Sequence, residues 1–238
     1  MSFQRNRSQQ RRHIKPIKRN ELQCILSAQR SKDGKSSVKF EQEQIEWDKK
    51  WNSDKVTYCL TKDSKDIEND AGEWKAVWLA MNTWSLEIPL TLQLVKKDKN
   101  PDITIEFADS YEEPIFKDNT DMLAFAHFPG TPEQGTIKLN EDKLWSLDGK
   151  FLGFNKTYNM VHTLVHEIGH ALGLTHAAPK FSLGSVMSTN YNGTLQLSNN
   201  DIDRIVAKYD EKPGRNSKNY KDTKKELLDQ IKNLKILK

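Results

Sequence analysis

Four of the six histidines of this 238-residue chain lie in one stretch, HTLVHEIGHALGLTH, at residues 162–176. The rest of the stretch is mostly apolar and is typical of a buried helix, where an imidazole needs a hydrogen-bond partner or a ligand. His166 and His170 are four residues apart, so on a helix they share one face and can reach the same ion. This stretch therefore predicts a core helix that carries a metal site.

The residues after this helix predict a third ligand. Gly173 lacks a Cβ, so it can adopt a positive φ and end the helix in a tight left-handed turn. Such a turn would bring His176 to the same ion from another direction. Three imidazoles leave a fourth position for water, as in a catalytic zinc site. We therefore expect one catalytic Zn²⁺, held by His166, His170 and His176.

Glu167 is the candidate catalytic residue. It lies about 100° around the helix from His166, so it can sit beside the metal without binding it. We expect a zinc-dependent endopeptidase, in which Glu167 activates a zinc-bound water for attack on a peptide carbonyl and then returns the proton to the leaving amine. His162 precedes His166 by four residues. We interpret it as a helix-face histidine, because three ligands along one straight helix cannot surround an ion.

The hydrophobic pattern predicts a mixture of strands and helices. Strand, helix, strand, strand in sequence suggests a right-handed crossover and a partly parallel sheet. Strands are expected at 55–60, 90–95, 102–108, 122–130 and 135–140, and helices near 66–84, 157–174 and 198–210. Thr157 or Asn159 would cap the second helix. The core-facing side of the first helix is expected to carry Trp74, Val77, Trp78, Met81 and Trp84.

The charge of the chain is unevenly distributed. Of the net charge of +4, residues 1–20 contribute +7 and residues 211–238 contribute +5, which leaves −8 for residues 21–210. Basic ends are typical either of solvated tails or of segments that contact polyanionic surfaces. Both interpretations stay open.

These patterns divide the chain into three parts. We expect a basic flexible or regulatory extension at residues 1–45, a catalytic domain at 46–211 and a Lys-rich tail at 212–238. The tail has a helical pattern, which favours a helix packed loosely on the body over one that docks on a partner or membrane. The apolar face of this helix would contain Leu227, Leu228, Ile231 and Leu234.

The sequence leaves the cellular compartment open. No apolar run approaches the roughly 18 residues that a transmembrane helix needs. The first thirty residues do not contain the apolar region of a signal peptide. Cys24 and Cys59 are too few for a disulfide scaffold, and they leave open one disulfide or two thiols.

From about Trp47 to Asp210 the chain resembles the matrixins, the matrix metalloproteinase branch of the metzincin zinc proteases. The pattern H-E-x-x-H-x-x-G-x-x-H is met at every fixed position, and Met187 in SVMS matches the methionine turn expected after it. The likeness extends to ITIEFA, LAFAHFPG, NEDKLW and LQLSNNDIDRI. The resemblance implies an α+β fold with three helices and a twisted five-stranded mixed sheet, in which four strands are parallel and one edge strand is antiparallel.

The resemblance also implies how a protein or peptide substrate would bind. The substrate would add a strand to the sheet, with Leu123, Ala124 and Phe125 offering their backbone and Tyr191 forming a wall of the specificity pocket. It further implies secretion or a cell-surface location, although no signal peptide is visible. We expect a monomer similar to the minimal bacterial members.

One departure from the family concerns its second, structural zinc. The histidines that bind this ion are replaced by Phe125 and Lys138. Because phenylalanine cannot ligate and lysine repels a cation, we expect no structural zinc. Calcium in the nearby acidic loop stays an open alternative. Its candidate ligands are Asp109, Glu112, Glu113, Asp118 and Asp121.

Two other functional classes compete with the peptidase. One is a catalytically silent metalloprotease fold whose basic tails bind polyanions. It is disfavoured because Glu167 and all three candidate ligands are present. The other is a nucleic-acid-binding protein with a structural metal. It is disfavoured because the chain lacks a closed four-ligand set and its basic stretches lack interleaved aromatic residues.

Overall fold

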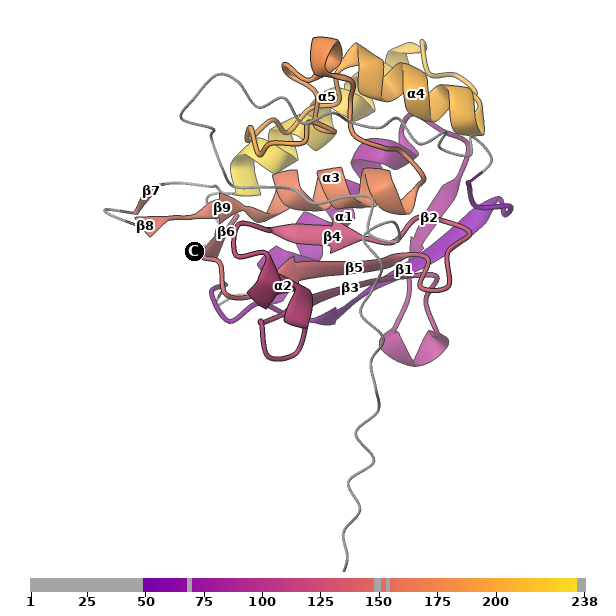
Figure 1. Ribbon diagram of the computed structural model, residues 1–238. Coiled ribbons are helices and arrows are strands. Elements are labelled where there is room, and N and C mark those ends of the chain that lie inside the picture. The colour runs from indigo at the N-terminus through magenta and orange to yellow at the C-terminus, as the bar shows by residue number, and fades with distance from the viewer. Residues whose placement is uncertain (1–48, 68–69, 148–150, 153–154, 235–238) are drawn as a thin grey trace, which may run out of the picture.

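The computed structural model describes residues 49–67, 70–147, 151–152 and 155–234 (Figure 1). The predicted extension at residues 1–45 and Cys24 lie outside the described residues, so these predictions and the state of the two cysteines stay open. Cys59 itself is buried in the sheet.

A five-stranded sheet with the order β2-β1-β3-β5-β4 forms the centre of the molecule. β1 (Lys55–Lys62) pairs in parallel with both β2 (Thr91–Leu94) and β3 (Ile103–Ala108). β3 pairs in parallel with β5 (Thr136–Asn140), and β4 (Ala124–Ala126) is the antiparallel edge strand beside β5. The predicted sheet, with four parallel strands and one antiparallel edge strand, is confirmed.

Helices cover both faces of this sheet. α1 (Asp70–Ser85) and α3 (Met160–Ala171) share the main core with one face, and α4 (Asn199–Tyr209) and α5 (Lys218–Asn233) lie on the same side (Figure 1). The short helix α2 (Pro114–Asp118) covers the other face. The remaining elements are η1 (Lys97–Lys99), β6 (Trp145–Ser146), β7 (Phe151–Leu152), β8 (Asn155–Lys156), β9 (Tyr158–Asn159) and η2 (Pro179–Phe181).

The three predicted helices correspond to α1, α3 and α4. The prediction for α1 is wrong in one respect, because Trp78 is 41% exposed whereas Val77 and Met81 are fully buried. Trp78 lies about 100° around the helix from Val77. The buried face instead extends the other way, to Leu79 and Ala80, because α1 packs against both the sheet and its neighbouring helices.

The tail forms an ordered helix on the body. Ser217 caps α5 by accepting a hydrogen bond from the backbone N–H of Tyr220, and Leu227, Ile231 and Leu234 are buried in the main core. The division of the chain at residue 211 stays a prediction. Within the described part of the chain, the helices are all too short or too polar to span a bilayer.

Candidate metal centre and active site

The helix α3 that carries the histidines runs through the middle of the core, with every residue buried. Its first turn is capped by Asn159, whose side chain accepts a hydrogen bond of 2.9 Å from the backbone N–H of His162. Of the two predicted capping residues, Asn159 is therefore the one used. The cap satisfies a backbone donor that would otherwise be orphaned in the protein interior.

The C-terminal end of α3 has the predicted left-handed turn. Gly173 has φ 94°, and its N–H donates to the His170 carbonyl at 2.7 Å. The N–H of Leu174 donates to the Gly169 carbonyl at 2.9 Å, which completes a Schellman motif. This turn reverses the chain and brings His176 back towards the helix.

The three predicted ligands meet at this end of the helix. The candidate ligand atoms of His166, His170 and His176 all lie within 4.8 Å of one another, and the Nε2 atoms of His166 and His170 are 2.9 Å apart. His162, interpreted from sequence as a helix-face residue, lies outside this group. The Nδ1–H of His162 instead donates to the Thr194 carbonyl at 2.5 Å.

Backbone carbonyls fix the tautomers of two of these rings. The Nδ1 of His166 is 2.7 Å from the Val186 carbonyl oxygen, and the Nδ1 of His170 is 2.5 Å from the Leu174 carbonyl oxygen. Because a carbonyl only accepts, each Nδ1 carries the hydrogen and each Nε2 of a neutral ring presents a lone pair. Two lone pairs that face each other at 2.9 Å repel unless a cation lies beside them. These residues therefore fit a zinc ion.

The charge state of the rings is consistent with metal binding. Burial lowers the pKa of His166 and His170 well below the ordinary value. Burial, followed by the charge of Arg204, lowers the pKa of His176 to about 4. The three imidazoles are therefore neutral at pH 7, which is the form that binds a metal ion.

Glu167 is fully buried beside the ligands. Neither of its carboxylate oxygens has a hydrogen-bond partner among the described residues. Burial raises the pKa of Glu167 well above its ordinary value. Because a buried carboxylate with no partner costs several kcal/mol, its position calls for a nearby cation or water.

The Met187 side chain lies against the histidine helix at Gly169, which lies between His166 and His170. Its carbonyl accepts a hydrogen bond from the Ala177 N–H at 2.8 Å, which ties this turn to the segment that carries His176. A Cβ at Gly169 would lie only 2.4 Å from the Met187 sulfur. Sequence reasoning missed this need for glycine, because the two residues are separated by a long loop.

Asp201 is a second residue that sequence reasoning missed. Its buried carboxylate accepts hydrogen bonds from the Ser185 hydroxyl at 2.5 Å and the Val186 N–H at 3.0 Å. It also accepts from both the N–H and the hydroxyl of Ser198, which completes a capping box on α4. Asp201 thus holds the segment whose Val186 carbonyl orients His166. The spacing of Ser198 and Asp201 could have indicated the cap, but not this second contact.

The edge strand β4 has one backbone edge paired and the other facing away from the sheet. The Leu123 carbonyl accepts from the Asn140 N–H at 2.8 Å, and the His127 N–H donates to the Thr136 carbonyl at 3.0 Å. In an antiparallel ladder, bonding directions alternate along the strand. Phe125 therefore also faces β5, whereas the backbone groups of Ala124 and Ala126 face outward. Of the three residues expected to offer their backbone to a substrate, Leu123 and Phe125 instead face β5 and only Ala124 faces outward.

Tyr191 lies at the beginning of the active-site helix. Its hydroxyl accepts from the Asn159 N–H at 2.9 Å, and its ring meets the His162 ring edge-on at a centroid distance of 4.6 Å. The loop from 188 to 197 therefore reaches the N-terminal half of α3, one helical turn before His166.

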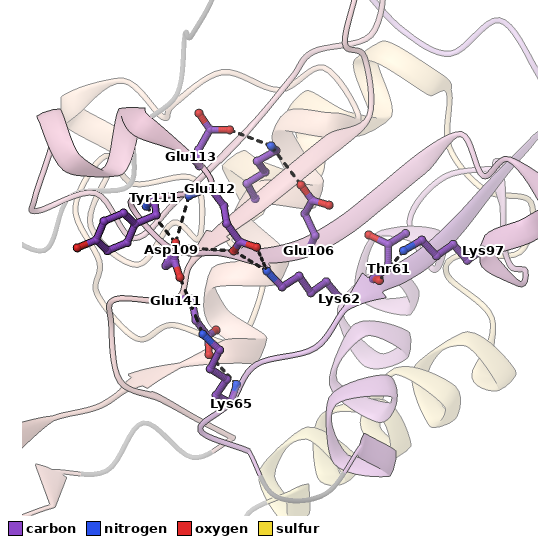
Figure 2. A network of polar contacts seen from close by, with 11 residues as sticks. Thr61, Lys62, Lys65, Lys97, Glu106, Asp109, Tyr111, Glu112, Glu113 and Glu141 are labelled. Atoms are coloured by element: carbon purple, nitrogen blue, oxygen red, sulfur yellow. Dashed lines mark hydrogen bonds and ion pairs between the residues drawn. The ribbon is translucent and has the colours of Figure 1, made fainter. Parts of the chain in front are cut away.

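Lysine side chains contact the acidic loop proposed for calcium (Figure 2). Lys138, opposite both Phe125 and Glu106 in the sheet, places its Nζ 2.8 Å from Glu113 and 3.1 Å from Glu106. Lys62 forms an ion pair with Glu112. Lys65 Nζ lies 3.9 Å from the Asp109 carboxylate. Three of the five candidate calcium ligands thus already have an ammonium partner.

A short segment at the start of the described chain crosses the turn at Gly173. The indole N–H of Trp51 donates to the Ala171 carbonyl at 2.9 Å, and its backbone N–H donates to the Tyr209 hydroxyl at 3.0 Å. The Tyr209 hydroxyl in turn donates to the Leu172 carbonyl at 3.0 Å. Segments that precede and follow α3 in the sequence therefore both secure its C-terminal end.

Replacing Gly173 with alanine is expected to cost about 2–4 kcal/mol of stability. A positive φ strains a side chain by about 1–2 kcal/mol. The new Cβ would also lie 2.2 Å from the Lys49 carbonyl oxygen. Gly184→Ala is the control, because Gly184 has φ 77° but open space around it. Urea unfolding would measure both variants, and equal losses would contradict the close approach at Gly173.

The sheet, the histidine helix and the methionine turn together have the architecture of a metzincin-type catalytic domain. The chain belongs to the matrixin family, whose model matches residues 50–210. That family consists of zinc-dependent endopeptidases, and the three-histidine cluster is compatible with its zinc site.

Relatives from animals and plants agree with this assignment. Interstitial collagenase of Sus scrofa is 31% identical over 164 residues, which cover 67% of this chain and 33% of the collagenase. Matrilysin of Felis catus is 34% identical, over 72% of this chain and 63% of its own length. Metalloendoproteinase 1-MMP of Arabidopsis thaliana is 27% identical, over 77% and 50%. The chain thus spans about a third of the collagenase and less than two thirds of matrilysin.

Proposed function

We propose that this protein is a zinc-dependent endopeptidase, with His166, His170 and His176 as zinc ligands and Glu167 as general base. The observation that carries the proposal is the pair of imidazole Nε2 atoms of His166 and His170, 2.9 Å apart, whose opposite nitrogens face backbone carbonyls. Neutral rings held in this way have no evident use other than to bind a cation.

Peptide hydrolysis needs a Lewis acid, which zinc would supply, and a proton carrier, which we assign to Glu167. When bound, zinc supplies a Lewis acid that polarises a peptide carbonyl and acidifies water. Glu167 takes the proton of the attacking water and delivers it to the nitrogen of the leaving amine. Burial raises the pKa of Glu167, so its carboxyl group can hold the proton taken from water until it is delivered to the leaving nitrogen.

The substrate is proposed to be a protein or peptide that binds along β4 as an added strand. The outward backbone groups of Ala124 and Ala126 would pair with it, while Leu123 and Phe125 hold the strand to β5. Tyr191, which packs on His162, would form a wall beside the side chain that follows the cleaved bond. Met187 would support the histidine helix by packing against Gly169.

We further propose one zinc per chain and no structural zinc or calcium at the acidic loop. The ammonium groups of Lys138 and Lys62 support this count, because they lie where a second cation would be repelled. The same contacts neutralise the carboxylates of Glu106, Glu112 and Glu113 without a metal.

Elemental analysis combined with casein cleavage tests the proposal. One zinc per chain is expected, and chelation should abolish cleavage, which one equivalent of zinc but not calcium restores. His176→Ala should lose the zinc. His127→Ala, which removes a buried histidine outside the cluster, should keep it.

Two results would contradict the proposal. Two zinc ions per chain would overturn the assigned count. One zinc without cleavage of casein, despite an intact Glu167, would favour the catalytically silent binding module.

A further inference from the structure

The C-terminal helix is fixed to the body by a buried carboxylate. The side chain of Glu87, just after α1, is only 1% exposed. It accepts hydrogen bonds from Arg215 Nε at 2.7 Å, the Tyr220 hydroxyl at 2.8 Å and Lys224 Nζ at 2.7 Å. All three donors belong to the segment that follows α4, beyond residues 50–210.

Backbone contacts and apolar packing reinforce this anchor. The backbone N–H of Lys212 donates to the Glu87 carbonyl at 3.1 Å, and Lys212 Nζ donates to the Ser85 carbonyl at 2.6 Å. Leu227 and Leu234 lie in the same core cluster as the histidine helix. A buried carboxylate that is fully paired costs much to expose, so α5 is held in one place.

Beside this anchor, α5 lies close to the loop that precedes α4. Leu227 and Leu228 of α5 line a small cavity together with Gln196 and Leu197 of this loop and with Thr83 of α1. Leu197 also packs against the core cluster that contains Leu227, so the end of the loop lies beside α5.

The same loop contacts the histidine helix α3 near its N-terminal end. The Thr194 carbonyl accepts from His162 Nδ1 at 2.5 Å, and the Thr194 N–H donates to the side chain of Asn192 at 2.9 Å. Tyr191 directly precedes Asn192 and packs its ring on His162. One loop therefore lies beside α5 at Gln196 and Leu197 and contacts His162 through Thr194 and Tyr191.

We propose that α5 is a positioning element for the substrate-side loop at 188–197, so that it sets how tightly the peptidase holds its substrate. This inference rests on the proposed function. Glu87 and Leu227 act through the loop and contact neither the substrate nor the ligands. The effect should appear in KM and in the mobility of the loop, and not in zinc content or kcat.

Leu227→Ala and Leu234→Ala in the full zinc-loaded chain form the test. Both leucines are buried in the same core, but only Leu227 lines the cavity beside the loop. Leu227→Ala is expected to raise KM by about two- to thirtyfold, and to speed hydrogen exchange of residues 188–197. Leu234→Ala should leave both close to wild type. Equal changes in the two variants, or no change in either, would overturn the proposal.

A second pair of variants covers the case in which Leu227→Ala fails to fold. Glu87→Gln removes the charge that joins Arg215, Tyr220 and Lys224. Glu211→Gln removes an exposed carboxylate that contacts Arg215 and Asn216 but neither Tyr220 nor Lys224. Only Glu87→Gln should loosen the loop and raise KM. Hydrogen exchange does not require activity. If hydrogen exchange of residues 188–197 is unchanged in Glu87→Gln, this inference is contradicted. An inactive wild-type protein would contradict only the proposed function.

Discussion

Replacing Glu167 with glutamine is expected to lower kcat/KM by about 10²–10⁴-fold, the usual contribution of a general base. Glutamine has nearly the same shape but cannot take a proton from water. The zinc content should not change, because Glu167 is not among the clustered ligand atoms. Stability should not fall, because a neutral amide costs less to bury than a carboxylate that has no partner among the described residues.

Steady-state cleavage of a fluorogenic peptide, with zinc analysis of the same samples, would check this expectation. Glu133→Gln is the control, since Glu133 is 62% exposed and pairs with His127 away from the cluster. If Glu167→Gln retained more than about a tenth of the wild-type kcat/KM, another group would have to move the proton.

Replacing Asp201 with alanine is expected to cost about 3–5 kcal/mol of stability, as when one partner of a buried charged network is removed. The substitution leaves the Ser185 hydroxyl and the Val186 and Ser198 N–H groups without their acceptor. The Val186 carbonyl would then hold His166 less firmly. Zinc affinity should consequently fall by about 10–100-fold, the usual effect of losing support behind a ligand.

Urea unfolding and competition with a zinc chelator would measure the two effects. Asp203→Ala is the matched control, because Asp203 lies on the exposed side of the same helix. Its effect should stay within about 0.5 kcal/mol. If the two variants behaved alike, the carboxylate of Asp201 would not be what holds the methionine turn.

Features set by nearby residues could be predicted from sequence. The positions of the five main strands follow from the hydrophobic pattern, although the strand expected at 122–130 is shorter and spans only Ala124–Ala126. The cap at Asn159 and the turn at Gly173 follow from spacing along one helix. The three histidines meet because local geometry brings them together. Trp78 could not be placed in this way, because helical spacing does not say how wide the buried face of α1 is.

Contacts between distant segments could not be predicted. The sequence shows that Phe125 and Lys138 stand where the family has histidines. It does not show that the Lys138 ammonium lies between Glu106 and Glu113, because that position depends on strand register. The docking of α5 depends on Glu87, a single acidic residue among apolar neighbours. Neither residue belongs to a pattern with a period.

The contacts of Trp51 with the C-terminal end of α3 have a consequence for the order of folding. Trp51 reaches Ala171 across 120 residues and Tyr209 across 158. Contacts of such long range form late, because closing a long loop costs entropy before the contact offsets it. The turn that positions His176 is therefore completed only when Trp51 and Tyr209 have come together. We therefore expect the chain to bind its metal as one of the last events of folding. A metal-bound site would then indicate that the domain has folded completely.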